Sequence, residues 1–365
     1  MANTFKSLLG DDVVNTRTML HEAIPITGTI ASGTYKEGTT ETNIKTFSHG
    51  MFESVYDYPY LSSSANHIFD VTFGYSSAHS SSANTQNSKK VNIYNQMAQV
   101  LMGYDINGNI RKFDSDGTLD DDGAGTMNHC FFVNFSRLLV KDEIKKNTFR
   151  LNLFTSGSTN APVNLQALGD YNSTNQFRTS PAGDYGLIFT ASADNSDEYT
   201  GAASVGLLFY QAGVLVLTAS IFSGSVGAPG ALNSDDAPAG QSSDEDLAIA
   251  RVGITRAMTG STIETMAGGF RHLINDIDFN NTIELNSAIY FCRINHNEFN
   301  YSSNPTYVNG SKLVVKNNVN DLPISYLTTV GLYSPDNELL AVAKLSEPIR
   351  KDPNTELTLR VRLDY

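Results

Sequence analysis

Alternation of apolar and polar residues is the strongest pattern in the chain. In Glu356–Tyr365 every second residue from Leu357 to Leu363 is apolar and the residues between them are Thr, Arg and Arg. This pattern predicts a strand with one buried face. The apolar runs Leu327–Tyr333 and Glu338–Leu345 flank a Ser-Pro-Asp-Asn turn and predict a β-hairpin. Pro348 is expected to interrupt the chain after this hairpin.

Further strands are predicted where β-branched, aromatic and other apolar residues form short runs. These runs are Ile68–Tyr75, Cys130–Phe135, Thr148–Phe154, Tyr185–Ala191, Ser287–Ile294 and Lys312–Lys316. Gly201–Phe222 holds two apolar runs around Gln211–Gly213, which predicts the strongest local hairpin, placed centrally in a sheet. Residues 155–182 are rich in Asn, Ser and Gly and are expected to form a loop.

Helical spacing of apolar residues is less common. Val91–Met102 has this spacing, with Ser88 as the expected N-cap and Gly103 just after the C-terminus. Val13–Ala23 is expected to form a helix of three turns that Pro25 ends.

A helical insertion is expected at about 243–278. Ser243 precedes Asp244–Met258, in which apolar residues recur at helical spacing and the first turn is acidic. Glu264–Asn275 predicts a second short helix, weakened by Gly268–Gly269.

Together these patterns predict a β-rich α+β fold. We expect an extended N-terminal arm over residues 1–50, a mixed α/β region with an acidic loop over 51–128, and a β-sandwich-like body over 129–365 that carries the helical insertion. A polar arm of this length satisfies few of its own hydrogen bonds. We therefore expect it to lie on a neighbouring subunit; the alternative is a wrapped or partly disordered terminus.

Charge limits the possible partners. The 365 residues include 25 Lys and Arg against 38 Asp and Glu, a formal net charge of -13 without a basic stripe. Binding to nucleic acid or to a membrane surface relies on clustered basic residues, so both are disfavoured. Residues 1–12 do not resemble a secretory signal, and the apolar run Val205–Phe222 is too interrupted to span a bilayer. We expect a protein that stays soluble in a reducing cytoplasm.

Sequence motifs for catalysis or metal binding are missing. The seven histidines are scattered, and Cys130 and Cys292 have no metal-ligand spacing. Ser223–Gly227 lacks the first glycine of a nucleophile elbow, and Pro229 forbids the helix that such an elbow needs. The sequence therefore predicts no enzyme, no cofactor and no resident metal.

The acidic loop Asp105–Gly125 holds five aspartates between positions 114 and 122 and superficially resembles a calcium loop. If Gly117 were the sixth position of such a loop, Lys112 would be the first and Gly123 would stand where a Glu ligand is needed. A solvated loop is expected; the alternative is an adventitious divalent-ion site.

Several longer stretches carry a recognisable pattern when they are taken together. They are Thr16–Gly28, His49–Phe73, Lys141–Leu153, Val205–Thr218, Tyr290–Tyr307 and Thr328–Tyr365. This pattern resembles a virion structural protein of large contractile-tailed phages, especially those that infect marine cyanobacteria. This resemblance covers most of the chain outside the acidic and Ser/Gly-rich loops. It implies a non-enzymatic assembly component that virion symmetry repeats, associated more with tail and baseplate than with capsid.

An acidic β protein without a reactive site agrees with this role, because its affinity would come from broad interfaces. Aromatic residues in exposed-looking loops are the candidate interface residues. They are Tyr56, Tyr58, Tyr60, Phe299, Tyr301 and Tyr307. For each of them, ordinary core packing or loop anchoring is the alternative.

The expected partners are copies of the chain itself and other phage tail or baseplate proteins, in a virion assembled in the host cytoplasm. One alternative is a neck or capsid-associated virion protein. Another is a receptor-binding or glycan-binding tail fibre, although the chain lacks the repeats that a fibre would show. A secreted adhesin is disfavoured because no signal peptide is recognised.

Overall fold

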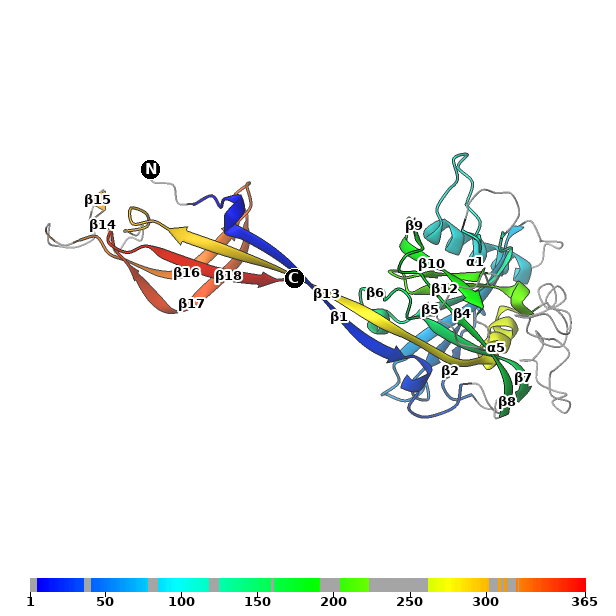
Figure 1. Cartoon of the computed structure of the whole chain (residues 1–365). Helices are drawn as coiled ribbons and strands as arrows, with labels where there is room; N and C mark the ends of the chain where they lie inside the picture. The colour runs from blue at the N-terminus through cyan, green and yellow to red at the C-terminus, as the bar shows by residue number, and fades with distance from the viewer. Residues whose placement is uncertain are drawn as a thin grey trace. The chain divides into compact units, whose positions relative to one another are not determined.

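The computed structural model describes residues 5–35, 41–77, 85–117, 125–158, 161–190, 204–222, 262–301, 308–309, 312–313, 320 and 322–365. Two compact units are present. Unit 1 comprises Met1–Met19 and Glu284–Tyr365, and unit 2 comprises Leu20–Ile283. The fold is a β-rich, sandwich-like α+β fold, which confirms the predicted class (Figure 1).

The described strands are β1 (Val13–Pro25), β2 (Ile44–Thr46), β3 (Glu53–Tyr56), β4 (His67–Tyr75), β5 (His129–Phe135), β6 (Glu143–Ile144), β7 (Arg150–Ser158), β8 (Ala161–Gly169), β9 (Phe177–Ser180), β10 (Gly183–Thr190), β11 (Ser204–Phe209), β12 (Val214–Thr218), β13 (Ile274–Ile294), β14 (Val308–Asn309), β15 (Lys312–Leu313), β16 (Ser325–Tyr333), β17 (Leu339–Lys351) and β18 (Leu357–Asp364). The helices are α1 (Thr85–Leu101), α2 (Arg137–Val140) and α5 (Ile263–Leu273), with 3-10 turns η1 (Gly10–Asp12), η2 (Thr27–Thr29) and η4 (Ala219–Phe222).

The largest sheet runs in the order β1-β13-β7-β8-β10-β11-β12-β5-β4-β3-β2, with β6 and β18 also paired to β13 and β9 paired to β10. The predicted hairpin of β11 and β12 is confirmed and lies between β10 and β5. Its turn uses Gly213 at φ +67°, a conformation that favours glycine. On β12, Leu215 and Leu217 enter one apolar core, and Val214 and Val216 enter the other. Both faces are covered, and the strand is therefore apolar almost throughout.

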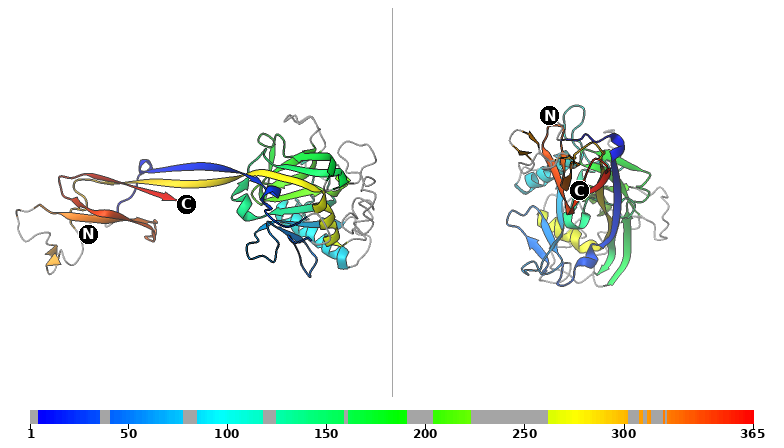
Figure 2. Two further views of the ribbon diagram at one scale, coloured as in Figure 1. Left: turned by 90° about the horizontal axis from the view of Figure 1, so that it is seen from below. Right: turned by 90° about the vertical axis from the view of Figure 1, so that its left-hand side faces the viewer.

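The sheet of unit 2 curves over a shared core (Figure 2). Phe135 of β5 lies 5.3 Å from Phe279 of β13, centroid to centroid, although several strands separate β5 from β13 in the sheet. Helix α5 packs into the same core, where Phe270 stacks on Phe131 at 4.8 Å. Helix α1 covers β4 closely at Gly74, because a Cβ there would stand 2.8 Å from the Lys90 carbonyl oxygen.

A buried ion cluster joins α5 to β3. Arg271 is 1% exposed and donates from Nε to Glu53 at 3.2 Å and from its terminal nitrogens to both Glu41 oxygens at 2.9 and 2.5 Å. It also donates to the Tyr35 carbonyl oxygen. Burial raises the pKa of Glu53, and Arg271 opposes that rise. The cluster fixes α5 against the sheet edge while leaving its guanidinium fully partnered.

Unit 1 contains β18, paired with the second half of β13, and a separate hairpin of β16 and β17. Both predictions for this region are confirmed, including alternate exposure along β18. Pro348 does not end β17, contrary to the prediction. The register of β17 against β16 shifts between Leu327 and Thr329, and the resulting bulge takes in the proline, which has no N–H to donate.

Several sequence predictions are wrong. Val13–Ala23 is not a helix but most of β1, which pairs with β13, a partner distant in sequence. Residues 155–182 are not a loop, because they contain β8 and β9. Ser88 lies inside α1, which begins at Thr85, and is not its N-cap.

The domain boundaries also differ from those expected. The units divide at 19/20 and 283/284, whereas the sequence suggested divisions at 50/51 and 128/129. The expected N-terminal arm is thus shared between the two units. Helix α5 confirms the second half of the helical insertion despite Gly268–Gly269, while Asp244–Met258 lies outside the described residues.

Truncation of Phe270 tests the core of unit 2. Phe270→Ala should lower the free energy of unfolding by about 3–5 kcal/mol, because it removes the ring stacked on Phe131 and leaves a cavity. Urea unfolding measures this loss. The matched control Ile106→Ala, at a side chain 97% exposed, should change the value by less than about 0.5 kcal/mol. Equal effects of the two substitutions would contradict the described packing.

Candidate interaction surface

Three of the predicted interface aromatics lie together in unit 2, at the end of β3. Tyr56 is half-buried, and Tyr58 and Tyr60 are 37% and 38% exposed. Asp57 braces the turn that carries them, because its carboxylate accepts hydrogen bonds from the backbone and side-chain N–H groups of Asn66 at 2.6 and 2.9 Å. The two exposed tyrosines are therefore presented from a well-bonded turn.

Two others lie in unit 1, in the turn after β13. Phe299 adopts φ +53°, and Tyr301 is 43% exposed. The turn is organised by Lys351, which is fully buried and donates to the His296 carbonyl oxygen at 3.1 Å and to Asn300 Oδ1 at 2.7 Å. A buried ammonium group with several acceptors fixes this backbone, because moving the turn would leave the charge unsolvated.

The structure therefore places the predicted aromatics in two sets that belong to different units. Tyr307 lies outside the described residues. The participation of the other five in an interface stays a prediction.

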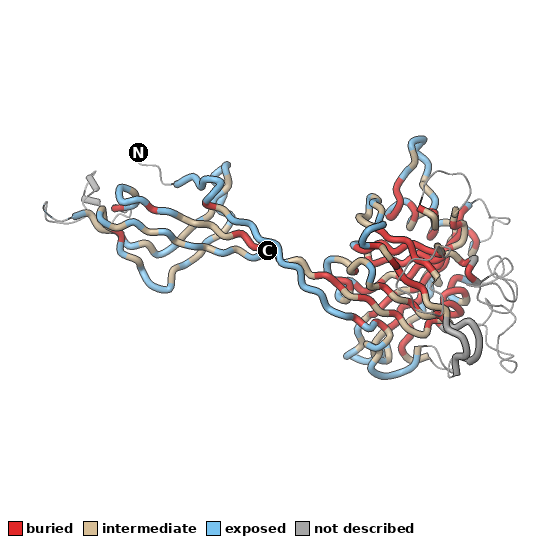
Figure 3. Tube along the Cα trace, in the orientation of Figure 1, coloured by how far each residue is buried: buried red, intermediate tan, exposed pale blue. Residues whose placement is uncertain are grey.

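Most described residues of unit 1 are exposed or half-buried (Figure 3). They include apolar residues outside the predicted interface set. Those on β16 and β17 are Tyr326, Tyr333, Leu339, Leu340 and Val342, each between 46% and 69% exposed. Among the residues described in unit 1, Ala288 and Ile294 are the only buried apolar ones, whereas buried apolar residues fill unit 2. A folded unit of this length normally buries far more apolar surface. Within the described residues, the sheet faces of unit 1 thus expose apolar side chains that the unit itself does not bury.

The sequence contained one signal for this surface. In Glu338–Leu345 the apolar residues occupy both alternating sets of positions. Such a strand is apolar on both faces, and two strands with a turn cannot cover both faces of their own sheet.

Charge is divided unequally between the units. Unit 1 contains ten Lys and Arg against eleven Asp and Glu, a net charge of -1, and unit 2 contains fifteen against twenty-seven, a net charge of -12. Two copies of unit 2 repel each other, whereas two copies of unit 1 meet almost without net repulsion. The nearly neutral unit is also the one with exposed apolar faces.

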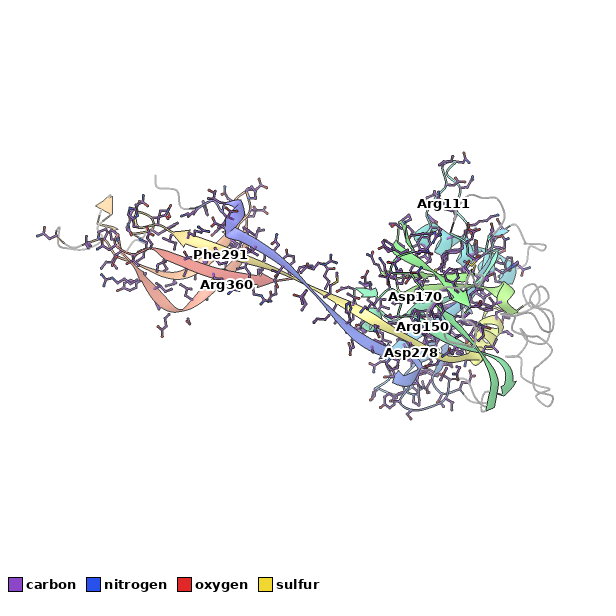
Figure 4. All side chains as sticks on the ribbon, in the orientation of Figure 1. Arg111, Arg150, Asp170, Asp278, Phe291 and Arg360 are labelled. Carbon is purple, nitrogen blue, oxygen red and sulfur yellow. The ribbon has the colours of Figure 1, made fainter. Side chains whose placement is uncertain are left out.

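The most perturbed carboxylates of unit 2 are satisfied structural groups. Asp170 is fully buried and accepts hydrogen bonds from the backbone N–H groups of Asn147 and Phe149 at 2.7 and 3.0 Å and from the hydroxyls of Ser173 and Tyr210 at 2.9 and 3.1 Å. Arg150 lies 3.4 Å away (Figure 4). Burial raises the pKa of Asp170 to about 6 in spite of these donors. Because these groups donate their hydrogen bonds to Asp170, the carboxylate links the end of β8 to the segment just before β7.

A second raised carboxyl lies on β13. Burial, together with a hydrogen bond to Asp276, raises the pKa of Asp278 to about 6 (Figure 4). Asp276 in turn accepts a hydrogen bond from the Thr27 hydroxyl. The two side chains lie two residues apart on one strand face, where a shared proton relieves their repulsion.

Local hydrogen bonds order the segment of the acidic loop around Asp105. Asp105 accepts backbone hydrogen bonds from Asn107 and Asn109, both at 2.8 Å, and these bonds lower its pKa. Residues 118–124, with three of the five aspartates, lie outside the described residues. Within the described ranges, no three His, Cys, Asp or Glu side chains converge as metal ligands do. Cys130 is buried in the core, which raises the pKa of its thiol.

No family model, curated protein or solved structure matches the chain. In the described part of the chain, none of the helices has both the length and the apolar character needed to cross a bilayer.

The raised pKa of Asp170 predicts a pH dependence of stability. The folded chain binds this proton more tightly than the unfolded chain, so the contribution of Asp170 to the free energy of unfolding falls as pH rises from about 4 to about 6 and is constant above. Asp170→Asn should remove this fall. Urea unfolding of both proteins at pH 4, 5, 6 and 7 measures it, and a constant difference between them across this range would contradict the assignment.

Proposed function

We propose that this chain is a non-enzymatic structural subunit of a phage virion, built into the contractile tail or its baseplate. Its partners are copies of itself and other tail proteins, and it engages neither nucleic acid nor membrane. The assignment to a phage particle is supported by the resemblance of the sequence to tail-associated virion proteins of contractile-tailed phages.

The observation that carries the assembly role is the uncovered state of unit 1. Its strands present apolar residues on faces that the described residues cover only in part, and just two apolar side chains are buried there. Exposed apolar faces lower the stability of an isolated chain, and a partner that covers them raises the stability of the complex. A subunit whose folding is completed by its neighbours suits a particle that assembles once and persists.

The titratable groups of unit 2 agree with this role. Asp170 and Arg271 are buried among several hydrogen-bond partners, so neither is available to a substrate. The functional part of the molecule is then its surface, where broad contacts can distribute the binding free energy.

Fractionated virions test the assignment. Tail-only and head-only particles, each purified and analysed by mass spectrometry, should show this chain in the tails at a fixed ratio to the other tail proteins. Host cytoplasmic proteins followed through the same fractions serve as the control for contamination. Recovery only with heads would favour the neck or capsid alternative, and absence from both fractions would end the proposal.

A pair of leucine substitutions tests whether unit 1 is the associating part. Leu340 in unit 1 and Leu138 in unit 2 are 69% and 72% exposed, so the same change at each disturbs folding equally little. Leu340→Glu should weaken self-association at least about tenfold, because a charge would be buried in the contact, while Leu138→Glu should leave it unchanged. Sedimentation equilibrium measures both. A larger effect at Leu138 would contradict this use of unit 1.

A further inference from the structure

The outer edge of β18 carries a row of backbone groups without partner strands. The N–H groups of Asn286 and Tyr365 each donate to the carbonyl oxygen of the other, at 3.2 and 2.9 Å. In an antiparallel ladder, residues bonded in this way alternate with residues whose N–H and C=O point away. With the register of β13 and β18 fixed, the residues that point away are Thr358, Arg360, Arg362 and Asp364.

This edge is open within the part of the chain that the structure describes, because β18 pairs with β13 alone. Leu357–Asp364 contains neither glycine nor proline, and nothing in it bends the strand away. An unguarded edge of this kind is a template for another strand. The apolar side chains of β18 are only half-buried, so an added strand would also extend a common apolar face.

β1, another neighbour of β13, offers less. The outer edge of β1 is open too, but ten consecutive residues of that strand, Val14–Ala23, are exposed on both faces. A strand added to β1 would gain hydrogen bonds without burying an apolar layer, and such pairing is marginal in water.

We propose that the outer edge of β18 takes the β18 strand of a second copy, antiparallel, with the two-fold axis at Leu359. This inference deepens the proposed function and rests on it. It names the second copy as a partner and adds the strand edge to the contact through the apolar faces of β16 and β17, and it joins two sheets into one across the subunits.

Backbone geometry limits the possible registers. Only the outward-pointing residues can bond to the new strand, so each must oppose another outward-pointing residue, and the two-fold axis falls on a residue. An axis at Arg360 would set that arginine against itself. An axis at Val361 would set Arg360 against Arg362. Like charges directly opposite each other destabilise a sheet.

The axis at Leu359 avoids these conflicts. It places Glu356 opposite Arg362 twice and Thr358 opposite Arg360 twice, so that unlike charges face each other. On the other face Leu357 opposes Val361 and Leu359 opposes its own copy. These are the non-hydrogen-bonded pairs, in which side chains approach most closely.

An axis at Leu363 would also pair unlike charges, because it sets Arg362 against Asp364. Asp364, however, already accepts hydrogen bonds from Arg362 Nε at 2.7 Å and from Ser287 Oγ at 2.5 Å within its own chain. In the Leu359 register the acidic residue is instead Glu356, which is held by one longer contact, with His296 Nδ1 at 3.3 Å. Arg360, the partner of Thr358 in that register, lies opposite Phe291 on the same face of the sheet as Arg362 and Asp364 (Figure 4).

Single cysteines identify the register. Leu359→Cys, Val361→Cys and Leu363→Cys are each made in a Cys292→Ser background, because Cys292 lies opposite Leu359 in the ladder. At a two-fold axis the Cα atoms of a non-hydrogen-bonded pair lie about 4.5 Å apart, within the range that a disulfide spans. Mild oxidation should cross-link only Leu359→Cys to a dimer. Cross-linking of either other variant instead, or of none, would overturn the proposal.

Proline substitutions provide an independent measurement. Arg360→Pro removes an N–H that points outward and leaves the ladder with β13 intact, whereas Leu359→Pro removes one that bonds to β13. Arg360→Pro should weaken the dimer at least about tenfold, while the melting temperature measured at concentrations where both proteins are monomeric is retained. Unchanged dimerisation would contradict the strand contact. Neither result alters whether the chain is found in tails, so the virion analysis separates the two proposals.

Discussion

The ladder of hydrogen bonds along β13 is the constraint on which both units depend. β13 is one strand of 21 residues, and its partners change along its length: β7 at Ile274–Asp278, β6 at Asn281–Thr282 and β18 at Ser287–Ile294, with β1 as a further neighbour. Neither glycine nor proline interrupts it. Each unit contains part of this strand: the ladder with β7 and β6 lies in unit 2, and the ladder with β18 lies in unit 1 and sets which residues of β18 point outward.

Stability and association are separated in this chain. Unit 2 buries apolar residues on both faces of its central strands and satisfies its buried charges internally, through the Arg271 cluster and the donors around Asp170. Unit 1 has the opposite character: its described residues bury little, and it is almost neutral. Under the proposed function, the hydrophobic effect that folds unit 2 within one chain acts in unit 1 through contacts between chains.

Sequence reasoning was accurate where local pattern and final environment agree. β18 and β12 were predicted because one alternates and the other is apolar throughout, and each pattern matches the burial of its two faces. β1 and the first half of β13 were missed because they are rich in Asn, Thr and Asp and become strands only through partners distant in sequence. β8 was missed for another reason: its partner β7 is adjacent in the chain, but the Asn, Ser and Gly residues around it predicted a loop. The candidate surface was chosen by residue type, so it found aromatic turns. The apolar residues on both faces of Glu338–Leu345 indicated a strand that needs covering on each side, but the exposure of Leu340 and Val342 depends also on which strands fail to cover β17, and the local pattern does not report that.

The two open sheets of unit 1 are not equally exposed to strand addition. β17 contains Pro348 within a bulge, next to the charged residues Glu347 and Arg350, and these are the devices that protect sheet edges from unwanted pairing. β18 has neither a proline nor a bulge, and its charges alternate with leucines and valine in a sequence whose halves complement each other across Leu359. Protection of one edge and not of the other is what a specific contact requires, because a chain open at every edge would aggregate. The proline and bulge of β17 hinder strand addition, and the regular β18 permits it. Both features therefore favour pairing at one edge only.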